Sequence, residues 1–106
     1  MKSIQIEEHI LFEWDKGNEL KNWLKHKVTN SEAEEAFYDK KRLVTEDTKH
    51  SSKEELRFIL FGKTKKVRLL FIIFTIRDEN IRIISARDTN RKEVQFYEKA
   101  ISITRI

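Results

Sequence analysis

Arginine is the residue type whose positions in this sequence suggest a chemical role. A guanidinium group is a rigid fork of N–H donors that matches the oxygens of a phosphate. Several of them at one place would bind a phosphate-bearing ligand. The competing interpretation is structural, because arginines at strand ends also pair with Glu or Asp and protect sheet edges. The arginines in question flank or end the apolar segments of the second half: Arg57, Arg68, Arg77, Arg82, Arg87 and Arg91.

Antiparallel pairing of consecutive strands would sort four of these arginines into two groups. Arg57 begins one predicted strand and Arg77 ends the next, so both belong at the same end of the sheet. By the same reasoning, Arg68 and Arg87 lie together at the opposite end. The sequence thus predicts two candidate basic clusters and leaves open which of them binds a ligand.

The stretch 82–97, RIISARDTNRKEVQFY, runs from an apolar strand into an amphipathic helix. This order predicts that Arg82, Arg87 and Arg91 surround one corner of the fold. Side chains alternate between the two faces of a strand. The alternation predicts one face with Ile81, Ile83, Ser85 and Arg87, and the opposite face with Arg82, Ile84 and Ala86.

Two other residues are candidates for proton transfer. His26 ends a predicted helix, where it could transfer a proton or simply complement the helix dipole. Glu55 lies two residues before Arg57, where it could be a general base or a salt-bridge partner. The chain has no cysteine, no HExxH pattern and no glycine-rich phosphate loop. These absences argue against a protein-bound metal and against a nucleotide-binding loop of the Walker type.

Charge is distributed unevenly along the 106 residues. Residues 1–61 carry 11 basic and 13 acidic side chains, whereas residues 62–106 carry 11 basic and 5 acidic ones. The basic second half indicates an anionic partner such as nucleic acid or an acidic protein. The longest apolar run, 67–76, contains Arg68 and is too short for a membrane-spanning helix, and the first residues lack a signal-peptide core. We therefore expect a cytoplasmic protein with no membrane association.

Hydrophobic patterning predicts an α+β fold in one domain, residues 1–106, with a mostly antiparallel sheet of four to five strands. Two N-terminal helices and one C-terminal helix pack against that sheet. Short linkers between the last three strands favour hairpins. The expected strands cover 9–14, 42–46, 56–62, 67–77 and 80–87, and the expected helices cover about 15–26, a segment starting near Ser31, and about 91–101.

The helices have predicted caps and inward faces. Asp15 is the expected cap of the first helix, Ser31 with Glu34 has capping-box spacing for the second, and Asn90 with Glu93 has it for the last. Periodicity predicts the residues that face the core. They are Leu20, Trp23 and Leu24 in the first helix, Ala33, Ala36 and Phe37 in the second, and Val94, Tyr97 and Ile101 in the last.

Several of these segments together resemble the BrnT toxins over residues 12–98. The C-terminal segment IRIISAR at 81–87, followed by Glu93 and Tyr97-Glu98, is the most specific part. Two positions depart from the family pattern. Lys27 replaces a glycine that would cap a helix, and Asn90 replaces a threonine with an equally good cap. Further matches are FEWD at 12–15, Asn22, KH-x-V at 25–28, Ala33, Phe37, Asp39, Glu55-x-Arg57, Gly62 and Arg68.

The resemblance implies a type II toxin with a RelE-like ribonuclease fold that cleaves RNA and stops translation without a cofactor. It also implies a BrnA-type antitoxin as partner, with operator DNA bound only through the antitoxin complex. Cleavage of RNA without a metal needs a proton-transfer group and cations that stabilise the phosphorane. The candidate catalytic residues are His26, Glu55, Arg57, Arg77 and Arg87, and the candidate RNA-binding residues are Lys25, Arg68, Arg82 and Arg91.

Two alternatives remain open at this point. A non-catalytic nucleic-acid binder would use the same arginines only to hold phosphate, with strong salt dependence and no cleavage products. A protein-interaction module would use the basic surface to bind an acidic partner and would show no affinity for RNA.

Overall fold

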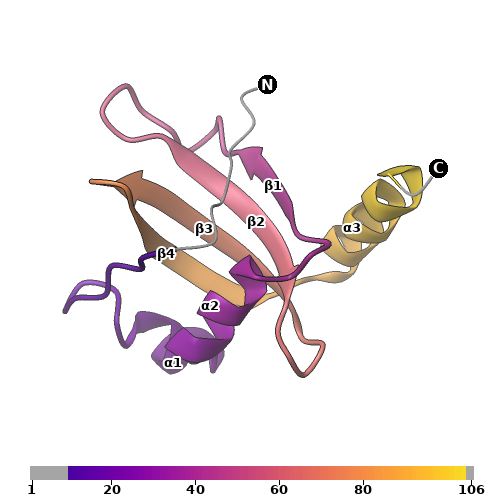
Figure 1. Ribbon diagram of the computed structural model, residues 1–106, viewed down its shortest axis with the longest axis horizontal. Helices are drawn as coiled ribbons and strands as arrows, with labels where there is room; N and C mark the ends of the chain where they lie inside the picture. Colours follow the sequence, from indigo (N-terminus) through magenta and orange to yellow (C-terminus); the bar gives the residue numbers. More distant parts are fainter. Residues whose placement is uncertain (1–9, 105–106) are drawn as a thin grey trace.

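A computed structural model describes residues 10–104 of the chain and shows an α+β fold. Four strands form one antiparallel sheet in the order β1-β2-β3-β4, with α1 and α2 packed against it and α3 beside it (Figure 1). The fold class is therefore as predicted. The elements are α1 (Lys21–His26), α2 (Asn30–Phe37), β1 (Leu43–Glu46), β2 (Arg57–Lys63), β3 (Leu69–Arg77), β4 (Asn80–Asp88) and α3 (Arg91–Thr104).

The strand predicted at residues 9–14 is the part of the predicted sheet that the structure does not contain as a strand. Within residues 10–14, the described part of that segment, the structure has one parallel bridge, between Phe12 and Ile81. The backbone N–H of Glu13 donates to the Ile81 carbonyl at 2.8 Å, and the Ile81 N–H donates to the Leu11 carbonyl at 2.8 Å. The segment turns away at Asp15, so the ladder does not continue. His9, the first residue of that prediction, lies outside the described residues.

A β-bulge in β4 overturns the predicted alternation of its side chains. The register shifts between Ile73 and Phe74, which pair with Ser85 and Ile83, so Ile84 is an extra residue. Beyond the bulge the two faces are exchanged. Ala86 is consequently buried in the core together with Ile81 and Ile83.

The same bulge moves Arg87 to the outer face of the sheet, away from the core, where Arg82 lies by ordinary alternation. Arg82 is opposite Thr75 and Arg87 is opposite Phe71, and these two partners are four residues apart in β3. At about 3.3 Å per residue, their cross-strand partners are roughly 13 Å apart. The predicted single corner of Arg82, Arg87 and Arg91 is therefore wrong.

Helix α2 packs on β2 and β3 with Ala33, Ala36 and Phe37 fully buried, as predicted. Its capping box differs by two residues from the prediction. Because the helix begins at Asn30, the cap is Thr29 and its reciprocal partner is Glu32. Close packing of α2 on β2 depends on Gly62, where an added Cβ would lie 2.2 Å from the Ala36 carbonyl oxygen.

Helix α1 is shorter than predicted and exposes the residues expected inside. Leu20, Trp23 and Leu24 are 61%, 46% and 69% exposed. Asp15 caps a turn instead of the helix, since its Oδ1 accepts from the Gly17 N–H and its carbonyl from the Asn18 N–H. The helix instead directs the buried Asn22 at β4, where its Oδ1 accepts from the Ala86 N–H at 2.9 Å.

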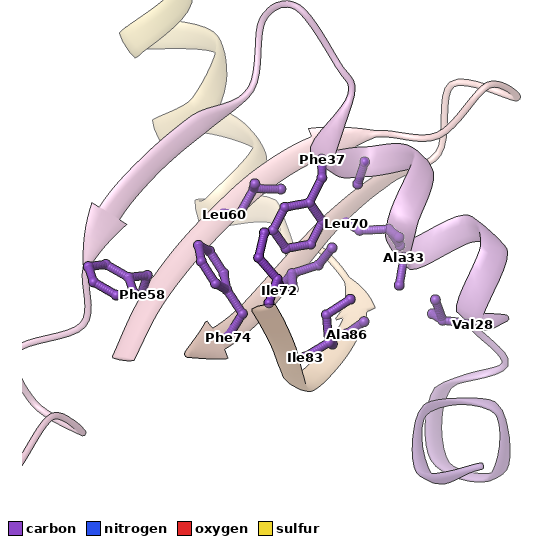
Figure 2. Packing of buried hydrophobic residues seen from close by; sticks show 12 residues of the cluster. Val28, Ala33, Phe37, Phe58, Leu60, Leu70, Ile72, Phe74, Ile83 and Ala86 are labelled. Carbon is purple, nitrogen blue, oxygen red and sulfur yellow. The ribbon is translucent and has the colours of Figure 1, made fainter. Parts of the chain in front are cut away.

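The core lies between the sheet and α2, and Figure 2 shows it from Phe58 at one end to Val28 at the other. Edge-to-face contacts join Phe37 to Phe12 and Phe74, with ring centroids 5.2 and 5.0 Å apart. These contacts attach the N-terminal segment and α2 to the middle of the sheet. The buried cluster consists of Val28, Ala33, Ala36, Phe37, Phe58, Leu60, Leu70, Ile72, Phe74, Ile81, Ile83 and Ala86.

Helix α3 follows β4 and lies beside the sheet (Figure 1). The predicted capping box is present, since Asn90 Oδ1 accepts from the Glu93 N–H and Glu93 Oε1 accepts from the Asn90 N–H. Tyr97 is buried against Phe61, as predicted, and Val94 and Ile101 are half-buried. Across residues 10–104, no helix has the length and apolar character needed to cross a bilayer.

Candidate basic pocket at the end of the sheet

Four cationic side chains and one carboxylate line a pocket of about 210 Å³ where β2 begins and β3 ends. We call it the basic pocket and define it by Lys21, Glu55, Arg57, Arg77 and Arg82. The side chains come from α1, the segment before β2, and three neighbouring strands. Sheet register explains their convergence, since Arg57 and Arg82 both pair with Thr75. The predicted grouping of Arg57 with Arg77 is confirmed.

Glu55 connects two of the arginines. The Arg57 Nε donates to Glu55 Oε1 at 2.9 Å, and the Arg77 Nη2 lies 3.6 Å from Glu55 Oε2. A half-exposed ion pair of this kind adds little to stability. Its consequence is geometric, because one carboxylate holds two guanidinium groups side by side while each keeps other N–H donors for a ligand.

Arg82 is more strongly engaged. Its Nη1 donates to Glu13 Oε1 at 3.1 Å and to Asp15 Oδ2 at 2.8 Å, and its Nη2 donates to Asp15 Oδ1 at 3.0 Å. The side chain is only 15% exposed. The hydrogen bond to Arg82 holds the pKa of the Asp15 carboxyl below its ordinary value. Arg82 therefore ties the N-terminal segment to β4 and contributes a largely neutralised charge to the pocket.

Lys21 is the pocket residue that sequence reasoning missed. Its Nζ donates to the Ile84 carbonyl at 3.1 Å, and it forms no ion pair with any carboxylate of residues 10–104. The bulge at Ile84 makes that carbonyl available, 63 residues away in sequence. The position of Lys21 directly before Asn22, a residue of the family resemblance, was the one signal that could have indicated it.

Arg68 lies at the other end of the sheet, and other residues of the protein accept hydrogen bonds from all of its N–H groups. Its Nε and Nη2 donate to Asp88 at 2.6 and 3.0 Å, and Nη1 donates to Glu32 at 3.1 Å. The two remaining N–H groups donate to the carbonyls of Lys27 and His26 at 3.0 and 3.3 Å. All five guanidinium donors are used. Arg68 thus closes the C-terminal end of α1, and none of its donors is left for phosphate.

Arg87 is held against the start of α3. Both carboxylate oxygens of Glu93 accept from its two Nη atoms at 2.8 Å, and its Cζ lies 4.1 Å from the centre of the Phe71 ring. The Arg87 guanidinium, followed by the Asn90 N–H, lowers the pKa of the Glu93 carboxyl against the opposing effect of burial. Arg87 is on the outer face of the sheet but outside the basic pocket.

The remaining predicted site residues are also outside the basic pocket. His26 is half-buried at the end of α1, where its backbone carbonyl accepts from the Arg68 Nη2. Lys25 and Arg91 are exposed. Since β3 is about 26 Å long from Leu69 to Arg77, His26 and Glu55 are at opposite ends of the sheet. The structure does not bring these two proton-transfer candidates together.

The acidic side chains do not assemble into a metal site in the described part of the chain. No group of three or more His, Asp or Glu residues among positions 10–104 could hold an ion. The carboxylates near the basic pocket are instead occupied by arginines.

The fold and the basic pocket define an α+β protein with a site suited to a phosphate-bearing ligand. A family model described as "Ribonuclease toxin, BrnT, of type II toxin-antitoxin system" matches residues 14–93. The chain belongs to this family, which implies RNA as substrate and an antitoxin as partner. The matched range includes every cationic residue of the basic pocket. A search among curated proteins finds no relative that matches the chain.

Proposed function

We propose that this single-domain toxin is an endoribonuclease that cleaves RNA in the basic pocket without a metal ion. The observation that carries the proposal is Glu55 held between Arg57 and Arg77 in a chain of a ribonuclease toxin family. A carboxylate flanked by two guanidinium groups supplies a proton acceptor beside cations that bind phosphate oxygens.

The proposed reaction uses the 2′-hydroxyl of the RNA as nucleophile. Glu55 takes the hydroxyl proton while the 2′-oxygen forms a bond to phosphorus, and the bond from phosphorus to the 5′-oxygen breaks. Arg57 and Arg77 stabilise the charge that develops on the non-bridging oxygens. The Lys21 ammonium gives a proton to the leaving 5′-oxygen. The products are a 2′,3′-cyclic phosphate and a 5′-hydroxyl.

Saturation of the other arginines favours this end of the sheet over the end with Arg68. Arg68 has no free donor, and Arg87 gives its two Nη groups to Glu93. In the basic pocket, by contrast, Lys21 has a single hydrogen bond within residues 10–104, to a backbone carbonyl. We therefore assign His26 and Arg87, with exposed Lys25 and Arg91, to contacts along the RNA backbone outside the reaction centre.

Purified protein and end-labelled RNA test this assignment. We expect cleavage that continues in EDTA and yields cyclic phosphate ends, with a loss of about 10²- to 10⁴-fold in kcat for Glu55→Gln. Arg57→Ala and Arg77→Ala should each cost about 10²-fold or more, as for loss of one transition-state donor. Glu98→Gln, an exposed carboxylate on α3, is the matched control and should be unchanged.

Three outcomes would contradict the assignment. Full activity of Glu55→Gln would remove Glu55 from the reaction. Loss of cleavage in EDTA would show that a metal is needed. Binding of RNA by the wild-type protein without any products would support the non-catalytic binder.

We further propose that the protein acts in the cytoplasm, where cleavage of RNA stops translation, and that a BrnA-type antitoxin covers the basic pocket. The pair would bind operator DNA through the antitoxin. Expression of the toxin alone should arrest growth and incorporation of labelled amino acids, and co-expression of the antitoxin should restore both. If the pocket is covered, Lys21→Glu should weaken the complex more than Lys99→Glu on α3 does.

A further inference from the structure

A second, larger pocket adjoins the basic pocket. Its volume is about 450 Å³, within the range of sites for small organic ligands. Glu55, Thr75 and Arg77 line both pockets. The Thr75 hydroxyl donates to the Leu56 carbonyl at 2.7 Å, which fixes the segment before β2 against β3. Whatever binds in the basic pocket therefore lies directly beside this adjoining pocket.

The adjoining pocket is lined by apolar side chains that remain partly exposed. Leu56 is 39% exposed and Ile76 is 46% exposed, beside Phe58 at the end of the core (Figure 2). The Phe58 ring is supported by Phe74, with ring centroids 5.5 Å apart. Phe58 itself is only 7% exposed, so the accessible apolar surface comes from Leu56 and Ile76. Such a surface suits the flat face of an unstacked base.

The rim of the adjoining pocket carries unused hydrogen-bonding groups. Lys53 and Glu54 line it, and neither side chain has an ion pair or hydrogen bond within residues 10–104. A carboxylate accepts from the exocyclic amino group of a base, and an ammonium donates to a ring nitrogen or keto oxygen. The rim therefore offers both kinds of group that the edge of a nucleobase requires.

We propose that the adjoining pocket binds the nucleobase next to the scissile phosphate and so sets the sequence preference of cleavage. The inference rests on the proposed ribonuclease function. Continuity of the two pockets carries it, because a nucleotide joins a phosphate, which the basic pocket suits, to a flat base, which the adjoining pocket suits. Leu56 and Ile76 would contact the base, and Glu54 would read its edge.

The test compares cleavage of a randomised RNA library by the wild-type protein, Leu56→Ser, Ile76→Ser and Glu54→Gln, with sequencing of the new ends. The two serine variants should raise KM by about 5- to 100-fold with kcat nearly retained, as expected when a base loses its stacking surface. Glu54→Gln should change which base is preferred beside the cut. Leu24→Ser, on the exposed surface of α1, is the control, and thermal unfolding confirms that each variant folds.

The outcomes separate this inference from the proposed function. Wild-type cleavage with unchanged KM and base preference in all three variants would overturn the nucleobase pocket and leave the ribonuclease intact. Unchanged cleavage with weakened antitoxin binding would assign the pocket to the antitoxin and also overturn the inference. No cleavage by the wild-type protein would overturn both.

Discussion

Arg87 and Glu93 form a bidentate ion pair that joins the last strand to the last helix. The two hydrogen bonds are both 2.8 Å long. Glu93 Oε1 also accepts from the Asn90 N–H, so the same carboxylate caps α3. The Glu93 carboxylate thus takes part in the cap of α3 and also links the first turn of the helix to β4.

Loss of this carboxylate should destabilise the protein. Glu93→Gln weakens the pair with Arg87, and Glu93→Ala removes the cap as well, so we expect about 1–2 kcal/mol lower unfolding free energy for the alanine variant. The coupling energy between Arg87 and Glu93 is measured by urea denaturation of Glu93→Gln, Glu93→Ala, Arg87→Ala and the corresponding double variants. A coupling energy near zero would contradict a stabilising pair.

Stability should fall in acid because several carboxyls have lowered pKa values in the folded state, Glu93 and Asp88 among them. Arg87 lowers that of Glu93, and Arg68 lowers that of Asp88. The folded protein then binds fewer protons than the unfolded chain, so the contribution is present above the unfolded pKa values of about 4. It is lost as pH falls through the lower folded values.

Thermal unfolding between pH 7 and pH 2 checks this dependence. The midpoint should decline from about pH 5 downward, and Glu93→Gln and Asp88→Asn should each flatten the decline relative to the wild-type protein. Glu98→Gln serves as the control because Glu98 is exposed on α3. A decline of equal steepness in all variants would show that other carboxyls cause it.

Arg68 should behave as a structural residue. Because all five of its N–H donors are used, Arg68→Lys should destabilise the protein nearly as much as Arg68→Ala, by roughly 2–4 kcal/mol. Denaturation and RNA binding should be measured on the same samples. If Arg68→Lys kept full stability and Arg68→Ala lost only RNA affinity, the role would be phosphate binding instead.

Gly62 should not tolerate a side chain. An alanine Cβ would lie 2.2 Å from the Ala36 carbonyl oxygen, so α2 would have to move off β2. We expect Gly62→Ala to cost about 2–4 kcal/mol of unfolding free energy by overpacking. Gly17→Ala is the comparison, because its nearest neighbours are the ends of two side chains at 3.0 and 3.1 Å. Equal stability of Gly62→Ala and Gly17→Ala would contradict this account of the packing.

Much of the fold followed from local patterns that tertiary contacts did not override. Ala33, Ala36 and Phe37 at helical spacing, and apolar strands joined by short linkers, were sufficient for α2 and the β2-β3-β4 meander. The two-residue turn at Asp78 and Glu79 forms a tight hairpin, with both residues at positive φ. Each of these features depends on residues close together in the chain.

The failures occurred where distant contacts outweigh a local signal. Leu20, Trp23 and Leu24 predicted an apolar inner face for α1, but Lys21 and Asn22 attach that helix to β4 through polar groups. Ser31 and Glu34 have the spacing of a capping box, but α2 begins at Asn30, so Thr29 is the cap. Glu34 instead accepts from the Trp14 Nε1 at 2.6 Å.

For the candidate site, the residue types and the strand ends that lie together could be predicted from the sequence. Arg57 and Arg77 had to meet because antiparallel strands of known order reverse direction at short turns. Tertiary structure alone decided which cations remain available for a ligand. A single extra residue at Ile84 turned Arg87 to the outer face, which Arg82 already shares. The carboxylates that bind Arg68, Arg82 and Arg87 lie up to 69 residues away in the sequence. Only the folded chain brings those charges within hydrogen-bonding distance.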